Sequence, residues 1–489
     1  MLREEMEQLR YRRQYLLVPQ PIECPFNYDE FRINDEYILY KHLDLVCDQY
    51  TTGNVSIFLL GDIYDYSDPA SGNTEILQKI IHDDFNVLLK NLSKIAGRYM
   101  LIFKKGKDLF LVNDCIAARK IFYAEKDGKI WFSSQQHLLA RVMGFKPTIN
   151  PDKKKYYSSR DFIIMNNAGI SNTTYYDEIF QLLPNKYFDV SRNKIIRFWP
   201  DRRIEKVDYR QQVEECAKII KGTIEGLANR YEIMLPITSG KDSRLLFAGS
   251  KDADRVYYYL NEMEHMNNKD LDVPKKLLKK LNLEFHLENL KGGVDDDFRK
   301  IYLENNPLAS EVFLPAIFNY YRKHSTKLNL PGNFPPAGVS HFKLRRKDYT
   351  GDFLMKLYGL DKYRYAARSY DDWLSSSREI CWESNINIIE LFYWEDRLAN
   401  WGTQIQTDKD ISQEEVNPFA SRYLSEIFFS VRYKDRLPPT IKFSRAVIQV
   451  LWPETLSMPV NPGFKKNAKA VLVKYNFTGF LRYYRTKLI

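Results

Sequence analysis

Cysteine is scarce in this 489-residue chain, and the few copies are far apart. A disulfide framework needs paired cysteines, and a zinc site needs cysteines or histidines at close spacing. The chain has five cysteines, an odd number, and none of them form a CxxC pair. The sequence therefore predicts neither kind of site and favours a reducing compartment. The five are Cys24, Cys47, Cys115, Cys216 and Cys381.

Long apolar runs are also missing. No stretch approaches the roughly 20 apolar residues that a membrane-spanning helix requires. The chain starts MLREEMEQLRYRRQ, which is charged and lacks the apolar segment of a signal peptide. We therefore expect a cytoplasmic protein without a membrane partner.

Positive charge is in excess but is not concentrated. Lysine and arginine number 73 against 63 acidic residues, which gives a formal net charge of +10. This excess is compatible with an acidic substrate, a nucleic acid or neither. The basic clusters, such as residues 153–155 and 345–347, are short and interrupted, which is typical of solvated helix faces. We therefore do not expect nucleic acid as a partner.

The pattern of apolar and polar residues changes near residue 200. Before it, runs with period-two alternation are separated by turn residues, as in GRYMLIFKKGKDLFLVND and RKIFYAEKDGKIWFSS. These runs predict β-hairpins and a sheet-rich α+β domain over residues 1–203. After it, short apolar runs alternate with helical periodicity, which predicts a parallel sheet with crossovers in an α/β domain over residues 204–489. The expected strands are 233–237, 256–260 and 283–287, with helices through 246 and over 273–281.

A small, hydroxyl-rich turn, TSGKDSR at residues 238–244, follows the first of these strands and precedes an apolar helix. Ligands of parallel sheets bind beyond the carboxyl ends of the strands. Small residues let the backbone approach a pyrophosphate, and a helix N-terminus attracts anions. Asp242 would repel phosphates unless a cation lay between them, so we interpret it as a magnesium ligand. The alternative, in which Asp242 and Ser243 merely cap the helix, is equally open from these residues alone.

The turn resembles the SGGxDS phosphate loop of the ATP-pyrophosphatase superfamily, and the chain around it is similar to the asparagine synthetase family. The resemblance covers nearly the whole chain. It implies an α+β N-terminal sandwich of the Ntn-hydrolase type, then a parallel-sheet ATP-pyrophosphatase domain with a helical C-terminal part. The stretches that resemble the family, in its order, are GDIYD, LFLVNDCIAARKIFYA, GKIWFSSQQHLL, IFQLLPNKYFDVSRNKIIRFW, DLDVPKKLLKKLNLEFH, NPFASRYLSEIFFSV and RLPPTIKFSRAVIQVLWPE.

The resemblance implies a ligase that uses ATP and Mg²⁺. A substrate carboxylate would attack the α-phosphate of ATP, pyrophosphate would leave, and an amine would displace AMP to form an amide. Asp242 would also hold the metal. The implied nucleotide-binding residues are Thr238, Ser239, Gly240, Lys241, Asp242, Ser243 and Gly332.

Two further residues are implied to be catalytic. Lys442, in PPTIKFSR, matches the lysine that the family places ahead of its C-terminal helices, and would neutralise charge near the α-phosphate. Its alternative is a solvated lysine at a helix start. Glu395 or Asp396, in ELFYWEDRLANWGTQ, would deprotonate the amine, or would instead pair with Arg397 on a helix surface.

Three departures from the family pattern qualify these expectations. The chain starts Met1-Leu2, where glutamine-using members have a nucleophilic cysteine after the initiator. We therefore expect an inactive glutaminase-like domain, as in β-lactam synthetases and lasso-peptide cyclases. Ser239 replaces a glycine, and no acid follows Gly332 where the family's GxGxDE segment has an aspartate. The second magnesium ligand is thus not placed.

Three hypotheses about function remain. The leading one is an amide-forming ligase whose amine does not come from glutamine, as in peptide macrocyclisation or the amidation of a small molecule or sugar. Its partners would be a small-molecule or peptide substrate and a partner biosynthetic enzyme. The second is a nucleic-acid-modifying enzyme with the same phosphate loop, and the third is a degenerate, non-catalytic partner protein.

Overall fold

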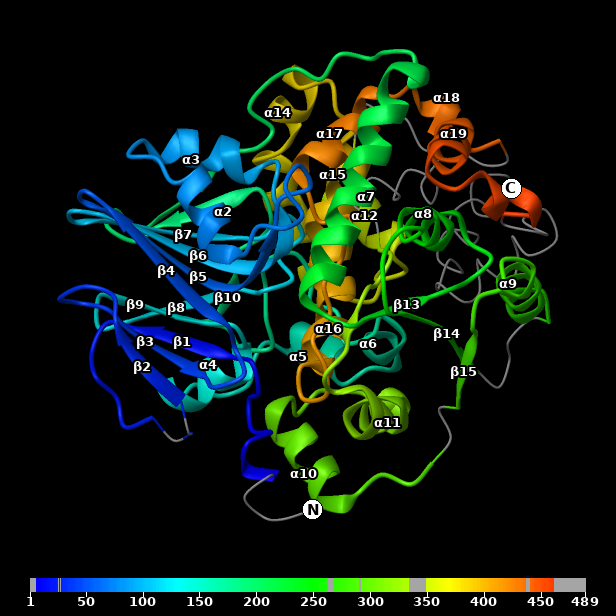
Figure 1. Ribbon diagram of the computed structural model, residues 1–489. Coiled ribbons are helices and arrows are strands. Elements are labelled where there is room, and N and C mark those ends of the chain that lie inside the picture. Colours follow the sequence, from blue (N-terminus) through cyan, green and yellow to red (C-terminus); the bar gives the residue numbers. More distant parts are fainter. Residues whose placement is uncertain are drawn as a thin grey trace, which may run out of the picture.

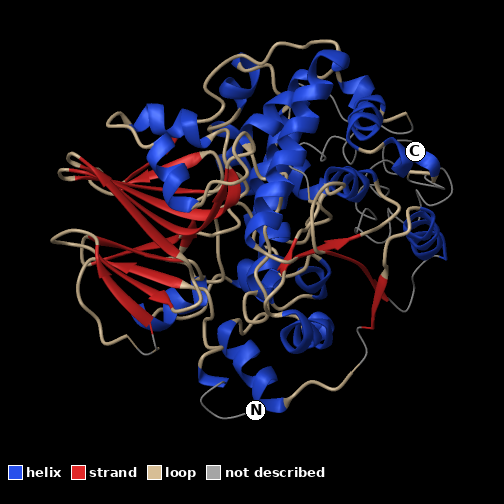
Figure 2. Ribbon diagram, in the orientation of Figure 1, coloured by secondary structure: helices blue, strands red, loops and turns tan. Residues whose placement is uncertain are grey.

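The computed structural model describes residues 6–24, 26, 28–262, 268–289, 292–333, 349–436 and 440–460. Two large antiparallel sheets gather on one side of the molecule, and helices with a smaller parallel sheet occupy the other (Figures 1 and 2). This mixture of antiparallel sheets followed by a parallel sheet matches the predicted class. Among the described helices, none combines the length and the apolarity that crossing a membrane requires.

The antiparallel sheets are six-stranded, with the orders β10-β8-β9-β1-β3-β2 and β12-β11-β7-β6-β5-β4. The predicted turns are present: Asp127 and Gly128, between β8 and β9, both have a left-handed φ that suits a tight hairpin. The strands are β1 (Tyr15–Val18), β2 (Tyr28–Arg32), β3 (Ile38–His42), β4 (Cys47–Thr52), β5 (Val55–Tyr64), β6 (Ala96–Lys105), β7 (Asp108–Asn113), β8 (Phe122–Lys126), β9 (Lys129–Ser133), β10 (Phe180–Gln181), β11 (Lys186–Asp189) and β12 (Lys194–Arg197).

The two sheets pack face to face between two layers of helices. Alternate residues of β1 enter different cores, because successive side chains of a strand point to opposite faces. Leu17 packs between the sheets, whereas Leu16 packs under α4 (Gln136–Met143). Likewise α2 (Asn73–Ile80) and α3 (Phe85–Leu92) cover the outer face of the second sheet. The predicted antiparallel sheets with helices around them are therefore confirmed, and the inactive, Ntn-hydrolase-like character of this part stays a prediction.

The parallel sheet has the strand order β15-β14-β13-β16. Its strands are β13 (Ile233–Pro236), β14 (Val256–Glu262), β15 (His286–Asn289) and β16 (Leu328–Asn329). The chain steps from β13 to β14 and β15 on one side, then returns to place β16 on the other side of β13. β13 is thus the point at which the strand order reverses. The helices around it are α7 (Val213–Arg230), α8 (Lys241–Gly249), α9 (Asn268–Lys280), α10 (Asp296–Asn305) and α11 (Leu314–His324).

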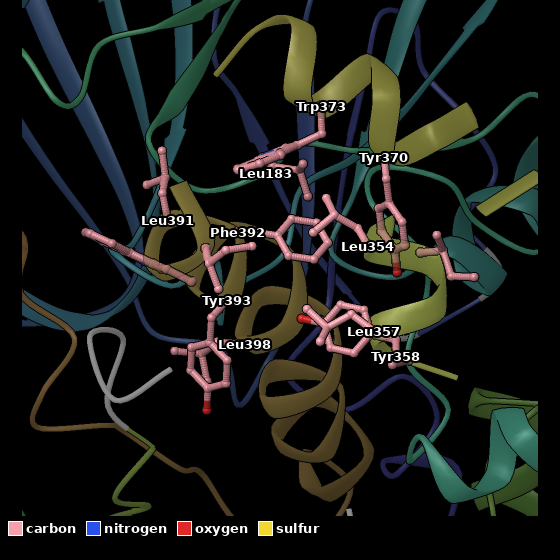
Figure 3. Close-up of a cluster of buried hydrophobic side chains, with 14 of the residues drawn as sticks. Leu183, Leu354, Leu357, Tyr358, Tyr370, Trp373, Leu391, Phe392, Tyr393 and Leu398 are labelled. Atoms are coloured by element: carbon pink, nitrogen blue, oxygen red, sulfur yellow. The ribbon is translucent and has the colours of Figure 1, made fainter. Parts of the chain in front are cut away.

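The rest of the described chain is helical, as predicted. Its apolar core joins segments that are far apart in sequence: Leu183, which precedes β11, lies with Trp373 and Phe392 in one buried cluster (Figure 3). The helices are α12 (Gly351–Leu357), α13 (Arg364–Ser375), α14 (Arg378–Glu383), α15 (Ile388–Phe392), a π-helix, η4 (Tyr393–Gly402), α16 (Thr403–Lys409), α17 (Arg422–Ser430), α18 (Tyr433–Arg436) and α19 (Lys442–Leu451).

Buried ion pairs connect the antiparallel part to the helical part. Arg98 on β6 lies 2.6 Å from Asp410, and Arg119 lies 2.9 Å from Glu414. The predicted domain boundary between residues 203 and 204 stays a prediction. The last antiparallel strand does end at Arg197, ahead of it.

Candidate active site

The turn at residues 238–243 lies at the carboxyl edge of the parallel sheet, where the strand order reverses. Pro236 pairs with Tyr259 of the parallel strand β14. Thr238 and Asn261 each come two residues later, so they lie at the same height along the two strands. On the other side of β13, Leu330 donates its N–H to the carbonyl of Met234, which brings the following segment up to the same edge. Such a reversal opens a crevice beyond the strands, because the loops on its two sides diverge.

Two hydroxyl groups hold the turn in shape. Ser243 Oγ accepts the N–H of Thr238 at 2.8 Å and donates to the carbonyl of Pro236 at 2.9 Å. Thr238 Oγ1 accepts the N–H of Gly240 at 3.2 Å. The hydroxyl of Ser243, which the sequence interpretation assigned to a ligand, is therefore used inside the turn, and its contribution to a phosphate would come from its backbone N–H.

The N-terminus of α8 has no side-chain cap. Gly240 is the N-cap residue in an extended conformation, and no side chain bonds to the first amides. Asp242 and Ser243 lie inside the helix, so the alternative interpretation of these two residues as caps is wrong. The amides of Lys241, Asp242 and Ser243 have no acceptor within the helix, because an α-helix begins with unpaired N–H groups. These N–H groups are hydrogen-bond donors that point out of the turn, and they lie at the positive end of the helix dipole.

Lys241 and Asp242 form an ion pair at the start of α8. Lys241 Nζ lies 2.7 Å from Asp242 Oδ1, and the side chains are 12% and 30% exposed. The one acid of the turn is thus reachable from solvent and carries a cation beside it. This arrangement places one ammonium and one carboxylate together at the start of α8.

Gly332 lies against the backbone of the turn, as its assignment to the nucleotide site requires. A Cβ atom built on Gly332 would stand 3.9 Å from both the carbonyl carbon of Asp242 and the amide nitrogen of Ser243, and 3.4 Å from Leu246. The next residue, Asn333, accepts a hydrogen bond on its carbonyl from Asn417. Residues 334–348, where the family's missing aspartate was expected, lie outside the described residues.

Sequence reasoning missed a buried polar network that fixes the edge strand β16. Asn329 accepts from Tyr259 at 2.8 Å and donates to Glu415, which also accepts from Lys409 at 2.6 Å. Residues 329 and 415 form an isolated parallel bridge. The network holds the segment that carries Gly332 in place, but these residues are too far apart in sequence for any local pattern to indicate it.

Arg244, the last residue of the TSGKDSR motif, points away from the turn. It is fully buried and donates to the carbonyls of Thr455 and Met458. Burial lowers the pKa of its guanidinium to about 10. Arg244 therefore anchors the segment that follows α19 against α8, and this role was not predicted.

Lys442 is the first residue of α19. Its side chain is 55% exposed, and Nζ lies 3.9 Å from Asp435. The preceding Ile441 has a left-handed φ of 42°, which is strained for a β-branched residue. α19 shares a core cluster with α8, to which Phe443 and Leu246 both belong. The described contacts do not join Lys442 to the turn, so its catalytic role stays a prediction.

Glu395 is fully buried and lies in the π-helix η4. Its carboxylate is bound by both Nη atoms of Arg197, at 2.5 and 2.8 Å, by Asn185 at 3.0 Å and by Trp373 at 3.0 Å. The predicted alternative, a surface pair with Arg397, is wrong: Arg397 lies over the ring of Trp401 instead. The structure gives Glu395 a part in joining β12 to the helical core, and its role as a base stays a prediction.

The neighbouring Asp396 has a different environment. Its Oδ1 accepts the N–H of Ser171 at 2.7 Å, and burial raises the pKa of its carboxyl to about 7. A carboxyl that titrates near neutral pH suits proton transfer better than one held ionised by an arginine. Glu395 and Asp396 were the two acids predicted as bases, and the pKa of Asp396 suits that role better than the pKa of Glu395.

Comparison with known proteins gives little. No family model and no curated protein matches the chain. Three solved structures are similar at 10% identity: a glutamine phosphoribosylpyrophosphate amidotransferase from B. subtilis complexed with ADP and GMP (TM-score 0.25; 57% of this chain, 67% of that one), an allosteric regulatory enzyme of purine biosynthesis (0.26; 80% and 87%), and a glutamine-dependent NAD⁺ synthetase from Acinetobacter baumannii with ADP (0.17; 53% and 65%). At TM-scores this low, the likeness supports no functional inference.

Proposed function

We propose that this protein is an ATP-dependent ligase that forms amide bonds by activating a substrate carboxylate as an acyl-adenylate, with release of AMP and pyrophosphate. The observation that supports this most is the 238–243 turn: a parallel-sheet edge at a reversal of strand order, an uncapped helix N-terminus, and Gly332 beside it. The amine would come from a source other than glutamine, within a peptide, a small molecule or a sugar.

The residues of the 238–243 turn would fit a nucleoside triphosphate. The amides of Lys241, Asp242 and Ser243 provide donors for phosphate oxygens, and the ammonium of Lys241 provides a positive charge. Gly332 would leave room beside these amides, since a Cβ atom there would stand 3.9 Å from the amide nitrogen of Ser243. The described residues offer few ligands for Mg²⁺. Among the described residues no group of three potential ligands exists, so Asp242 would share the ion with phosphate oxygens and water.

The chain's part in the reaction would be positioning and charge neutralisation. Bound ATP would supply the activated α-phosphate and the pyrophosphate leaving group. The turn would hold the phosphates in line with the incoming carboxylate, which raises its effective concentration. Lys241 would neutralise charge that develops on the pyrophosphate, and Lys442 would neutralise charge near the α-phosphate. We assign the proton of the amine to Asp396 rather than to Glu395.

The antiparallel sandwich would support this site without hydrolysing glutamine. Buried ion pairs such as Arg98 with Asp410 join it to the helical part. Residues 1–5, where a nucleophile would stand in a glutaminase, lie outside the described residues. Because the proposal takes the amine from another source, glutamine added to the purified protein should give no glutamate above a heat-inactivated control. Glutamate production would show that the amine comes from glutamine and would overturn this part of the proposal.

Nucleotide binding tests the proposal without knowledge of the substrate. Calorimetric titration with α,β-methylene-ATP, which cannot lose pyrophosphate, should show saturable binding that strengthens when Mg²⁺ is present. Lys241→Gln should weaken this binding, whereas the exposed control Lys356→Gln should not. Absence of binding with Mg²⁺ present would contradict the proposal and favour a non-catalytic partner protein.

A further inference from the structure

A large cavity lies in the helical part of the molecule, apart from the 238–243 turn. Its volume is about 820 Å³, which falls in the range of about 300–1,000 Å³ that is usual for small-molecule sites. None of its described lining residues belongs to the turn. The walls come from α14, α15 and α18, which lie towards the top of Figure 1, and from the segment that follows β12.

The cavity is strongly basic. Four exposed cations from three separate segments line it: Arg203, Lys206, Arg378 and Arg432. Together they bring four positive charges to the lining, more than one phosphate or carboxylate group would neutralise. An anion with a single charged group would therefore satisfy only part of the lining.

The acidic residue that lines the cavity is already paired with an arginine. Glu390 is the one acidic residue among the described lining residues, and its Oε1 lies 2.7 Å from Nη1 of Arg436. Both of these side chains are buried, at 4% and 7% exposure. Their pair forms a neutral wall. Glu205 lies 3.2 Å from Arg203 outside the lining and offsets part of the charge of that one cation.

The rim carries an unusual aromatic residue. Trp382 lines the cavity and is 81% exposed. A tryptophan left so open to solvent presents a large apolar face, which commonly marks a contact surface for a ligand. The indole is also a natural optical probe of what enters the cavity.

We propose that this cavity binds a small molecule that carries at least two phosphate or carboxylate groups, which Arg378 and Arg432 hold together with the flanking cations. Arginine suits such groups because its planar donors match their oxygens. The limited volume of the cavity and the single exposed aromatic residue at its rim favour a small molecule over a nucleic acid strand, which would need a long track with several stacking residues.

The test uses the fluorescence of the full-length protein during titration with inorganic pyrophosphate and, separately, with citrate. The two probes distinguish phosphate from carboxylate recognition. At least one of them should produce a saturable change that disappears in Trp382→Phe and weakens as salt rises. The double variant Arg378→Gln/Arg432→Gln should bind about tenfold or more weakly. The control Arg192→Gln/Arg364→Gln removes equal charge from side chains that are 67% and 81% exposed, and should bind normally.

Three outcomes would overturn the proposal. The first is no saturable binding of either probe to the wild-type protein, including the case in which a single-stranded RNA oligonucleotide binds instead. The second is unchanged affinity in the double arginine variant, with its fold verified by circular dichroism. The third is loss of the Trp382 signal in Lys241→Gln but not in the arginine variant, which would locate the probe at the turn. Because Arg432→Gln changes an exposed residue, that single variant serves if the double variant does not fold.

Discussion

The ammonium of Lys241 lies 2.7 Å from Oδ1 of Asp242, so the two opposite charges of the 238–243 turn are paired with each other. Partly exposed pairs of this kind typically contribute about 1 kcal/mol or less to stability. Exchanging this pair for phosphate and metal contacts would therefore cost little. Under the proposed function, the pair would keep a cation for phosphate and a ligand for Mg²⁺ at the same edge of the sheet.

Ser243→Ala should destabilise the turn. The change removes a hydrogen bond from Thr238 and another to Pro236, and a net loss of about 1 kcal/mol for each is typical. We expect the free energy of unfolding to fall by about 2 kcal/mol in urea titrations. The control Ser375→Ala, at an exposed site, should change it by less than about 0.5 kcal/mol. An equal effect at both sites would contradict the role given to Ser243.

Gly332→Ala should separate stability from nucleotide binding. The φ of Gly332 is not left-handed, and the added methyl group would meet Leu246 at 3.4 Å, so the fold should tolerate it. The methyl group would nevertheless occupy the approach to the amides of α8. Calorimetry should show weaker binding of α,β-methylene-ATP by about tenfold. Gly292→Ala, where nothing lies within 4 Å, is the matched control. Unchanged binding in Gly332→Ala would remove this residue from the site.

Glu395→Gln should chiefly affect stability. Burial alone would raise the pKa of Glu395, but the guanidinium of Arg197 overrides burial and holds the pKa below its ordinary value. Breaking a buried pair typically costs about 3–5 kcal/mol. A carboxyl with a lowered folded pKa stabilises the protein above its unfolded pKa and loses that contribution as the pH falls through the folded pKa. The difference between wild type and variant should therefore be largest at neutral pH and shrink below about pH 4.

The exposed pair of Asp352 and Lys356 provides the control for this experiment. Asp352→Asn should lower the free energy of unfolding by less than about 1 kcal/mol. If Glu395→Gln left stability unchanged and abolished ATP turnover, Glu395 would be the base after all, and our assignment of Asp396 would be wrong.

Asp396→Asn should have the opposite pH dependence. Burial raises the pKa of Asp396 to about 7, so ionisation disfavours the folded state. This penalty is absent below the unfolded pKa and accumulates as the pH rises from about 4 to 7. The introduced amide would keep an oxygen that accepts from Ser171 and would avoid the charge. Urea titrations should show the variant gaining stability over wild type across this interval, and a constant difference would contradict the raised pKa.

The sequence predicts the elements better than the contacts between them. Period-two alternation located β6 and β7, and the Asp127-Gly128 turn chemistry placed the hairpin between β8 and β9, because these signals lie within a few residues. The strand predicted at 256–260 extends to Glu262, within the usual error of a strand end. The two-residue strand β16 was missed, since its pairing depends on β13, far away in the chain.

In the candidate site, too, the local elements were predicted better than the contacts between residues. The 238–243 turn and its helix were predicted from their own residues, and Gly332 was placed by resemblance. The internal use of the Ser243 hydroxyl was not predicted, although its partners Thr238 and Pro236 lie only five and seven residues away. The burial of Glu395 against Arg197 was not predicted either, because it depends on a partner that only the fold brings near. A pairing between residues that are 198 apart leaves no periodic trace in one sequence.

The measurement that tests the central claim most directly is Mg²⁺-dependent release of pyrophosphate and AMP from ATP, with the small-molecule fraction of a cell lysate supplying acid and amine. Wild type should release both products, and Asp242→Asn, which keeps the shape of the side chain, should melt at nearly the same temperature yet turn over about 100-fold or more slowly. Full Mg²⁺-dependent pyrophosphate release by Asp242→Asn would contradict the role given to this carboxylate, and formation of ADP and phosphate by wild type would contradict adenylation itself.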